Sequence, residues 1–317
     1  MSMWSSRYGN AYCVPYLYLK MKKIGVLINV SAGSVTSQDI AEAVRAAFER
    51  YGVQPRVEVA GADKLPAMAR AMRDEGFDCI VAGGGDGTIS AVAAELAGHR
   101  TALGVLPLGT LNHFARDIGM PLDVGKAIET ICTGDVRAVD VASVNGKIFI
   151  NNSSLGLYPD QARLRQRWRD RIGRWPALIL ASVVVLTRFP FLRVIAEFNG
   201  KRLSRRCPMV VVSNNEYKLK PGNLTERERL DKGELGIYLL RHEGRTGLLR
   251  IALHSLVYSL EETTSFENDR APEVIVMTRR RRLHVALDGE VYRLRSPLRY
   301  RSMPASLNVI APNSSDR

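Results

Sequence analysis

The sequence predicts an α/β protein in which a parallel sheet covered by helices is followed by a second, mainly antiparallel β domain. Two patterns lead to this class. Over the first 135 residues, short apolar runs alternate with helical stripes, as in βαβ units. Beyond about residue 136, strand-like runs are separated by hairpin turns. A chain of 317 residues has room for both domains.

The elements of the N-terminal half follow from this alternation. Ser37 lies before the first helical stripe and Gly52 closes it, while Thr88 is placed to cap the third helix and Gly98 to end it. Parallel strands present their carboxyl ends at one edge, where ligands bind. The predicted strands are 24–29, 56–60, 77–82 and 102–106, and the predicted helices are 40–51, 65–75 and 88–98.

In the second half, Asn145-Gly146 suits the type I′ turn of a hairpin between 141–144 and 147–150. Further strands are predicted at 194–198, 208–213, 235–240, 273–278 and 283–295. The resulting domains are 22–135 and 136–299, and residues 300–312 are expected to return to the first domain. Residues 1–21 are expected to be a disordered extension, with the functional chain beginning near Met21.

One stretch, AGGGDGTISAVAAELAG at residues 82–98, has the order strand, glycine loop, helix. Such a loop can direct backbone N–H groups at a phosphate at the positive end of a helix. The alternative is a tight turn that uses glycine only for its backbone freedom. The loop is neither a P-loop nor a dinucleotide fingerprint. Asp86 would repel phosphates unless a cation or a hydrogen-bond network accounts for it, which points to a nucleotide with magnesium.

Composition limits the partners. The four cysteines show no C-x-x-C and the five histidines no ligand spacing, so a reducing cytoplasm is expected. The apolar run from Pro176 to Leu186 is 11 residues long, short of the ~20 that cross a bilayer. A net charge of +13 favours anionic partners: a nucleotide, a nucleic acid or an acidic membrane surface.

Three motifs together carry a resemblance. They are GGGDGT at 83–88, LGVLPLGTLNHFARDIGMP at 103–121 and VALDGE at 285–290, with FINNSSLGLYP and VVVSNNEY between the last two. In order and spacing they resemble the diacylglycerol kinase catalytic family, particularly its bacterial soluble lipid kinases. The resemblance spans roughly residues 22 to 312.

The resemblance implies a three-layer α/β/α nucleotide-binding domain, similar to that of phosphofructokinases, and a β-rich domain with ATP and Mg²⁺ in the cleft between them. It implies an ATP-dependent lipid kinase that transfers the γ-phosphoryl group to a hydroxyl of diacylglycerol or a related long-chain lipid. The implied general base is Glu290, with Asp86 also catalytic. The implied nucleotide-binding residues are Gly84, Gly85, Asp86, Gly87, Thr88, Thr110, Asn29 and Asn112.

From the residues alone, Glu290 could equally be an ordinary glutamate just past a hairpin turn. Three positions depart from the family pattern. His113 follows Asn112 where an aspartate is common, Lys232 replaces the aspartate of a magnesium turn, and Ala60 replaces a hydroxyl residue. A charged lysine cannot ligate magnesium, so the metal ligands stay unassigned.

The segment RLRQRWRDRIGRW, Arg163 to Trp175, has six arginines against a single Asp170. If it is helical, its apolar and indole groups share one face, as in a helix lying on an anionic bilayer. The alternative is an amphipathic helix that packs Trp168 against the core. Arg279 to Arg282 could extend the membrane surface or line a solvated strand edge. The membrane reading places the protein in the cytoplasm, peripheral on the inner face of the membrane.

Two other functions stay open from the sequence. An NAD kinase shares the glycine-aspartate loop but gives no reason for PLGTLNHFAR. A non-catalytic nucleotide- or nucleic-acid-binding protein agrees with the +13 charge. No RNA-binding aromatic motif is present, so a nucleic-acid partner is not expected. The chain could also pair into a homodimer.

Overall fold

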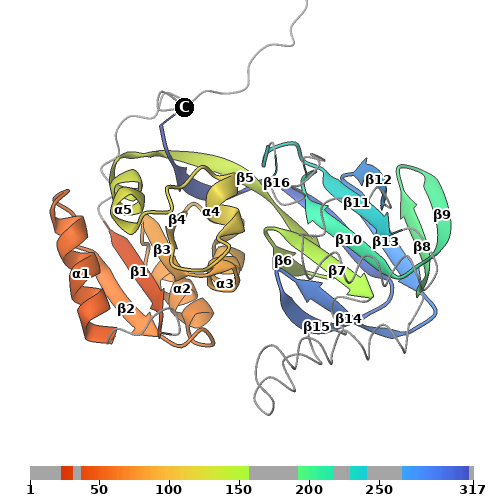
Figure 1. Cartoon of the computed structure of the whole chain (residues 1–317), viewed down its shortest axis with the longest axis horizontal. Helices are drawn as coiled ribbons and strands as arrows, with labels where there is room; N and C mark the ends of the chain where they lie inside the picture. The colour runs from red at the N-terminus through yellow and green to blue at the C-terminus, as the bar shows by residue number, and fades with distance from the viewer. Residues whose placement is uncertain are drawn as a thin grey trace, which may run out of the picture.

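The computed structural model describes residues 23–30, 37–156, 192–217, 227, 229–240 and 266–313. It has an α/β part and a β part side by side, which confirms the predicted fold class (Figure 1). The α/β part contains β1 (Ile24–Asn29), α1 (Ser37–Glu49), β2 (Arg56–Ala60), α2 (Leu65–Asp74), β3 (Cys79–Gly84), α3 (Asp86–Leu96), β4 (Ala102–Pro107), α4 (His113–Asp117) and α5 (Val124–Thr133).

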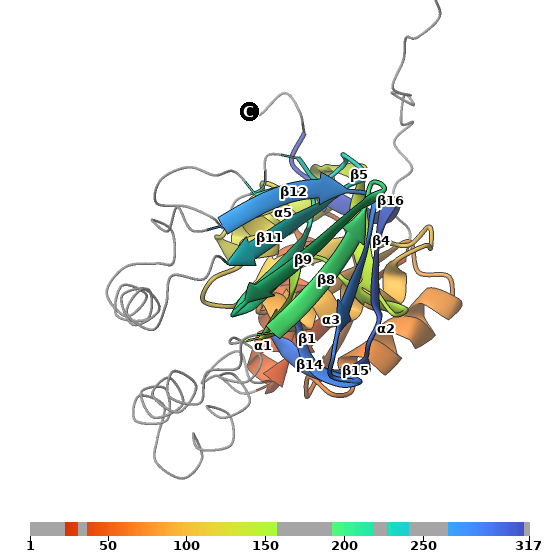
Figure 2. The ribbon, with the colours of Figure 1, turned by 90° about the vertical axis from the view of Figure 1, so that its right-hand side faces the viewer.

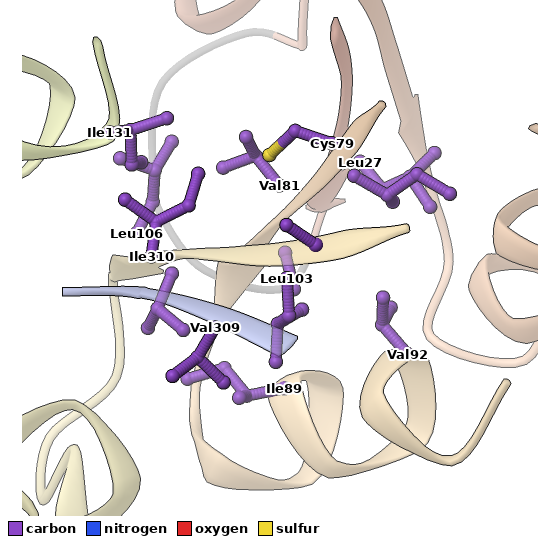
Figure 3. Packing of buried hydrophobic residues seen from close by; sticks show 14 of the residues in the cluster. Leu27, Cys79, Val81, Ile89, Val92, Leu103, Leu106, Ile131, Val309 and Ile310 are labelled. Carbon is purple, nitrogen blue, oxygen red and sulfur yellow. The ribbon is translucent and has the colours of Figure 1, made fainter. Parts of the chain in front are cut away.

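The strands of the α/β part are parallel and lie in the order β2-β1-β3-β4. Helices α2 and α3 contact each other on one face of this sheet, and α1 contacts α5 on the other. Because both faces are covered, β3 and β4 are buried along their whole length. Ile89 of α3 and Ile131 of α5 lie on opposite sides of β4 (Figure 3).

The β part is built from antiparallel pairs. Its own sheet has six strands in the order β12-β11-β10-β7-β14-β15. The strands that follow the α/β part are β5 (Asp135–Val144), β6 (Lys147–Phe149), β7 (Asn152–Gly156), β8 (Leu192–Phe198), β9 (Lys201–Cys207), β10 (Met209–Asn214), β11 (Leu235–Leu240), β12 (Phe266–Ala271), β13 (Glu273–Thr278), β14 (Arg282–Leu287), β15 (Glu290–Arg295) and β16 (Leu298–Ala311).

Strand β16 connects the two parts. Its first half pairs with β13, and near its end Val309 pairs with Leu103 of β4. It also pairs with β5 along most of its length, with a register shift between Met303 and Leu307. The resulting ten-stranded sheet therefore continues from the α/β part into the β part, in the order β2-β1-β3-β4-β16-β13-β8-β9, and its other two strands, β5 and β6, lie off this path, with β5 paired to β16 and to β6. The domain boundaries at 135 and 299 stay predictions.

Local geometry around the glycines differs from the expectation. Strand β3 continues through Gly83 and Gly84, and α3 begins at Asp86 with Gly85 as its N-cap. Thr88 lies inside the first turn of α3, so its predicted role as the cap is wrong. The strand can include the two glycines because they pair with Leu106 and Pro107 of β4.

Other predicted elements agree closely. The hairpin turn at Asn145-Gly146 has φ values of 48° and 81°, as a type I′ turn requires. The predicted strand 283–295 is two strands around Asp288-Gly289. The predicted extension 1–21 and the arginine-rich segment 163–175 lie outside the described residues. Among the residues that are described, no helix has the length and apolar character of a membrane span.

Candidate active site

The glycine loop lies at the point where the strand order of the parallel sheet reverses. From β1 the chain crosses to β2 on one side, whereas β3 and β4 lie on the other side, so the carboxyl ends of β1 and β3 form the switch point at which open α/β sheets bind ligands in a crevice. Asn29 ends β1, and its amide Nδ2 donates a hydrogen bond to the Thr88 hydroxyl at 2.9 Å. The end of β1 is thereby fixed to the first turn of α3.

Two glycine turns pack backbone against backbone beside this crevice. A Cβ on Gly109 would lie 2.5 Å from the Cα of Gly85, so Gly109 has no room for a side chain, whereas a Cβ on Gly85 would make an ordinary contact at 3.5 Å from the Cα of Gly109. The Leu108 N–H donates to the Gly84 carbonyl at 3.1 Å and holds the turns together. At Gly87, by contrast, a Cβ would meet no heavy atom within 4 Å. The loop is therefore closed on one side and open on the other.

Asn112 shapes the second turn. It is buried and has a left-handed backbone with φ 50°. Its Oδ1 accepts from the Gly109 N–H at 3.0 Å, and its Nδ2 donates to the Gly109 carbonyl at 2.9 Å. The amide is thus used within the turn, whereas Thr110 is exposed next to it. Of these two predicted nucleotide-binding residues, only Thr110 has a side chain turned to solvent.

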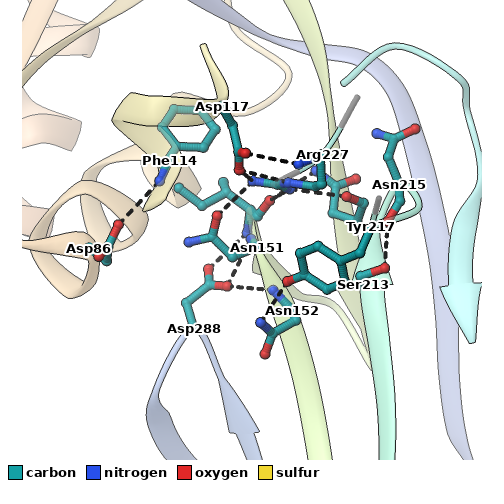
Figure 4. Close-up of polar contacts among 12 residues, drawn as sticks. Asp86, Phe114, Asp117, Asn151, Asn152, Ser213, Asn215, Tyr217, Arg227 and Asp288 are labelled. Atoms are coloured by element: carbon teal, nitrogen blue, oxygen red, sulfur yellow. Dashed lines mark hydrogen bonds and ion pairs between the residues drawn. The ribbon is translucent and has the colours of Figure 1, made fainter. Parts of the chain in front are cut away.

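Asp86 lies at the start of two helices. It opens α3, and its Oδ1 accepts a hydrogen bond from the Phe114 N–H of α4 at 3.3 Å (Figure 4). The N-terminal ends of helices favour negative charge. A hydrogen bond and two helix ends therefore account for a carboxylate inside the glycine turn. Within the described residues, no group of three or more His, Cys, Asp and Glu side chains could hold a metal ion.

The hairpin of the VALDGE motif reaches the helix of the glycine loop. Asp288, in the turn between β14 and β15, accepts a hydrogen bond from the hydroxyl of Ser90 on α3. Its carboxylate also accepts from the N–H groups of Ile150, Asn151 and Asn152 at 2.8, 2.8 and 3.0 Å (Figure 4). Burial raises the pKa of this carboxyl group, and the four hydrogen bonds oppose the shift. Asp288 thus joins the β part to the α/β part.

Glu290 follows as the first residue of β15 and is exposed. Its Oε2 accepts a hydrogen bond from the Tyr292 hydroxyl at 2.7 Å. Burial, and after it the hydrogen bond to Glu290, raise the pKa of Tyr292 to about 12, so the phenol stays protonated at neutral pH. Within the described residues, the other carboxylate oxygen of Glu290 makes no hydrogen bond.

A buried ion pair also connects the two parts. Arg227 donates from Nε and Nη2 to Oδ2 of Asp117 at 2.9 and 2.6 Å, and both side chains are almost inaccessible, at 0% and 2%. The same guanidinium donates to the carbonyls of Ile150 and Asn214 and to Oδ1 of Asn151 (Figure 4). Sequence reasoning missed this pair, although Asp117 and Asn151 lie inside two of the motifs that it used.

The turn around Lys232, where the family pattern has a magnesium turn, is held by hydrogen bonds to other parts of the protein. Gly233 N–H donates to Oδ2 of the buried Asp140 at 2.6 Å, and Lys232 N–H donates to Oδ1 of Asn215 at 3.1 Å. Asp140 also accepts from the Ala305 N–H of β16 at 2.9 Å. Asp231 pairs with Arg229, whose hydrogen bond lowers the pKa of Asp231. Asp140 therefore fixes this turn against β16.

The glycine loop of the α/β part ends in a helix N-terminus, which can bind a phosphate, and the β part packs the hairpin of Asp288 against that helix. This arrangement fits the class of two-domain phosphotransferases. The sequence profile described as "Diacylglycerol kinase catalytic domain" matches residues 23–144. The "Diacylglycerol kinase" of Bacillus subtilis (strain 168) is 28% identical over 243 residues, covering 74% of this chain and 79% of that protein.

A "Probable lipid kinase YegS-like" of Pseudomonas savastanoi pv. phaseolicola (strain 1448A / Race 6) is 31% identical over 242 residues, covering 74% of this chain and 76% of that protein. The crystal structure of a diacylglycerol kinase from Bacillus anthracis str. Sterne has a TM-score of 0.67 at 19% identity, covering 92% of this chain and 97% of that one. The chain belongs to the diacylglycerol kinase catalytic-domain family, with YegS-like lipid kinases among its relatives.

It is a lipid kinase, and membership of a kinase family implies the use of ATP. This membership favours the first of the three functions considered from the sequence over the NAD kinase and the non-catalytic binding protein. The predicted roles of individual site residues stay proposals.

Proposed function

We propose that the protein transfers the γ-phosphoryl group of ATP to a hydroxyl of diacylglycerol or a related long-chain lipid, with Glu290 as the general base. One observation carries the proposal: Ser90 of α3 donates a hydrogen bond to Asp288. Helix α3 begins at the glycine loop, and Glu290 is two residues beyond Asp288. The contact therefore brings the candidate base and the candidate phosphate site to the same helix.

The glycine loop fits a triphosphate. The first turn of α3 has N–H groups without partners inside the helix, and the open space at Gly87 leaves them accessible. Gly84, Gly85, Asp86 and Gly87 would hold the phosphates through these main-chain groups. Thr88 and Asn29 are already bonded to each other, so they would support the loop instead.

Charge neutralisation is the chemistry that Mg²⁺ supplies in phosphoryl transfer. Asp86 is the carboxylate inside the loop and the residue that would face the ion. Its Oδ1 bond to Phe114 N–H is long, at 3.3 Å, so little would be lost if the carboxylate turned. Thr110, exposed on the neighbouring turn, would contact the nucleotide from the other side.

Glu290 can take the proton of the lipid hydroxyl. A general base has to reach the proton that it removes, and an exposed carboxylate on a hairpin turn is accessible to a bulky alcohol. Because Tyr292 donates to Oε2, Oε1 is the oxygen that would receive the proton. Asp288 cannot do this as readily, since its two oxygens accept four hydrogen bonds.

The substrate is tested with the purified chain, Mg-ATP and a panel of lipids in mixed detergent micelles. Labelled phosphate should appear on diacylglycerol or another long-chain alcohol. Labelling of NAD, or of no lipid in the panel, would contradict the proposal.

The base is tested by Glu290→Gln, which keeps the size of the side chain but removes its basicity. We expect kcat to fall by about 10²- to 10⁴-fold with ATP binding unchanged in calorimetry. Glu273→Gln is the matched control, because Glu273 is an exposed glutamate on β13 that pairs with Arg301. If the Glu290→Gln enzyme kept its activity, Glu290 would not be the general base.

We also propose that the protein works at the inner face of the cytoplasmic membrane, where a long-chain lipid substrate lies. The segment Arg163 to Trp175 is the membrane-binding segment predicted from sequence, and the homodimer likewise stays a prediction. Flotation with liposomes tests the association directly, and salt should weaken it if anionic lipid is the partner.

A further inference from the structure

The ten-stranded sheet has a solvent-facing side within the β part. On β8 and β13, Val194, Ala196, Val274 and Val276 point into the core between the two sheets. Their neighbours along each strand point the other way, because side chains alternate across a strand. Figure 2 shows β9 and β8 side by side, and the sheet continues from β8 through β13 to β16. Their outward residues therefore form one continuous surface.

Arginines occupy much of this surface, and we call them the arginine face. In one row, Arg206 of β9 is directly opposite Arg193 of β8, and Arg279 continues the alternation just beyond β13. In another row, Arg202, Glu197, Ile275 and Arg299 follow each other across four strands. All members of the face are exposed: Arg193, Arg202, Arg206, Arg279, Arg299 and Arg301.

Few acidic groups balance these charges. Glu197 pairs with Arg202 at 3.3 Å, and Glu273 pairs with Arg301 at 2.8 Å. Within the described residues, no carboxylate pairs with the guanidinium groups of Arg193, Arg279 and Arg299. Like charges directly opposite each other destabilise a sheet. Arg193 and Arg279, which share a row, therefore repel each other unless an anion lies against them.

The middle of the face is apolar. Ile195 and Met277 are partly exposed between the two arginine rows, and Ile275 is partly exposed within the second row; none of the three belongs to the two buried clusters. A flat surface with apolar groups in the centre and cations around them matches the boundary between lipid headgroups and acyl chains. A phosphate backbone of a nucleic acid would use the arginines but not the apolar centre.

The charge of the whole chain is also divided unevenly. Residues 23–135 have 10 Lys and Arg against 14 Asp and Glu, whereas residues 136–313 have 31 against 17. Positive residues on an edge strand commonly protect it from aggregation, which explains Arg202 and Arg206 of β9. This explanation does not apply to Arg193 and Arg299, because β8 and β16 are internal strands.

We infer that the arginine face docks the protein on a bilayer surface rich in anionic headgroups. Each cation near such a surface contributes to the attraction, and the apolar centre adds contact with the acyl boundary. The inference rests on the proposed function in one respect, since a lipid substrate gives the enzyme a reason to bind a bilayer. It assigns the binding surface to described strands and does not use the segment Arg163 to Trp175.

The experiment measures binding of the full chain to sucrose-loaded vesicles by sedimentation. Vesicles of phosphatidylcholine with one quarter phosphatidylglycerol are compared with vesicles of phosphatidylcholine alone, in about 0.1 M salt. We expect the wild type to bind the anionic vesicles and Arg193→Glu/Arg299→Glu to bind them about tenfold or more weakly.

Arg50→Glu/Arg100→Glu is the matched control, because it makes the same change in net charge at exposed positions of the α/β part. It should bind the anionic vesicles within about threefold of the wild type. Circular dichroism melting checks that both variants are folded. Equal binding of the anionic vesicles by the two double variants would overturn the inference. It would also be overturned if Arg193→Glu/Arg299→Glu lost binding to duplex DNA, measured in the same buffer, but kept its binding to the vesicles.

Kinase activity on a short-chain lipid dispersed in detergent separates this inference from the proposed function. The arginine-face variant should keep that activity while losing activity on lipid in anionic vesicles. If the wild type phosphorylates no lipid in detergent, the proposed function fails, and the vesicle comparison still decides on the docking surface.

Discussion

Gly109 and Gly85 show how closely the two site turns approach. Gly109→Ala would place a methyl group 2.5 Å from the Cα of Gly85, and backbone atoms cannot move aside as a flexible side chain can. We expect the free energy of unfolding to fall by about 1–3 kcal/mol, as in other overpacked sites. Urea denaturation measures this, and calorimetry should show weaker ATP binding because the glycine loop is displaced.

Gly87→Ala is the control for this contact. No heavy atom lies within 4 Å of the added Cβ, and alanine is favoured over glycine in a helix by up to about 1 kcal/mol. Stability should therefore be unchanged or slightly higher, while ATP binding weakens if phosphate lies against Gly87. A Gly109→Ala protein as stable as the wild type would show that the turns are not held together as described.

Asp288 is predicted to position the hairpin that carries Glu290. In Asp288→Asn, an NH₂ group would face an N–H or hydroxyl donor where the carboxylate now accepts hydrogen bonds. We expect kcat to fall while KM for ATP changes little, together with a loss of about 1–3 kcal/mol in stability. Ser90→Ala removes only the hydrogen bond between α3 and Asp288, so it should lower kcat with a smaller effect on stability. An Asp288→Asn enzyme with wild-type kcat would contradict the positioning role.

At the scale of elements, the Asp117 and Arg227 pair fixes helix α4 to the β part. Asp117→Asn would leave a fully buried guanidinium without its counter-charge. Breaking one side of a buried pair costs about 3–5 kcal/mol, so urea midpoints should shift strongly. Arg70→Ala is the comparison, since the Arg70 side chain is 60% exposed in its pair with Glu95 and such pairs contribute about 0–1 kcal/mol. Similar losses in both variants would refute the special role of the buried pair.

Periodicity predicted those strands whose own sequence has the pattern of a strand. Strands β2, β11 and β13 have the predicted bounds, and β1 does as well. The missed strands have sequences without a strand signal. Strand β9 is KRLSRRC, an edge strand with charged residues on both faces, and β7 is NSSLG, whose first three residues are polar. Strand β16 contains Pro304, which falls at its register shift.

The candidate site was likewise predicted only where its residues are neighbours in sequence. The glycine loop was found because its strand, turn and helix are neighbours in sequence. Contacts between the two parts were not found, because they join residues far apart: 198 positions separate Ser90 from Asp288, and 110 separate Asp117 from Arg227. A motif can indicate that Asp288 and Asp117 matter, but not which group each one meets.

At the scale of the whole molecule, buried tyrosines give the protein a weakness at high pH. Burial raises the pKa of Tyr217 and Tyr292 to about 12, and it also raises the pKa of Tyr300. In the unfolded chain these groups lose their protons near pH 10. Between about pH 10 and 12 the folded state therefore binds more protons, and the free energy of unfolding falls as pH rises.

Absorbance at 295 nm, followed together with urea unfolding, measures this. Tyrosines of the folded protein should titrate in at least two groups, and stability at pH 11 should be lower than at pH 8.5. Tyr217→Phe should reduce the difference, because one of the shifted groups is then absent. A single titration near pH 10 for all 11 tyrosines would contradict the prediction.

The sequence by itself determined the α/β class, the bounds of four strands and the approximate positions of several others, the glycine loop and, through its motifs, the family. These depend on patterns within about 20 neighbouring residues, where side-chain periodicity and turn chemistry act directly. Only the tertiary structure decided that Asp288 meets Ser90 of α3, that Arg227 is buried against Asp117, and that separate arginines form one face. The physical reason is that sheet order and register bring distant residues together, and neither is written in any local stretch of the chain.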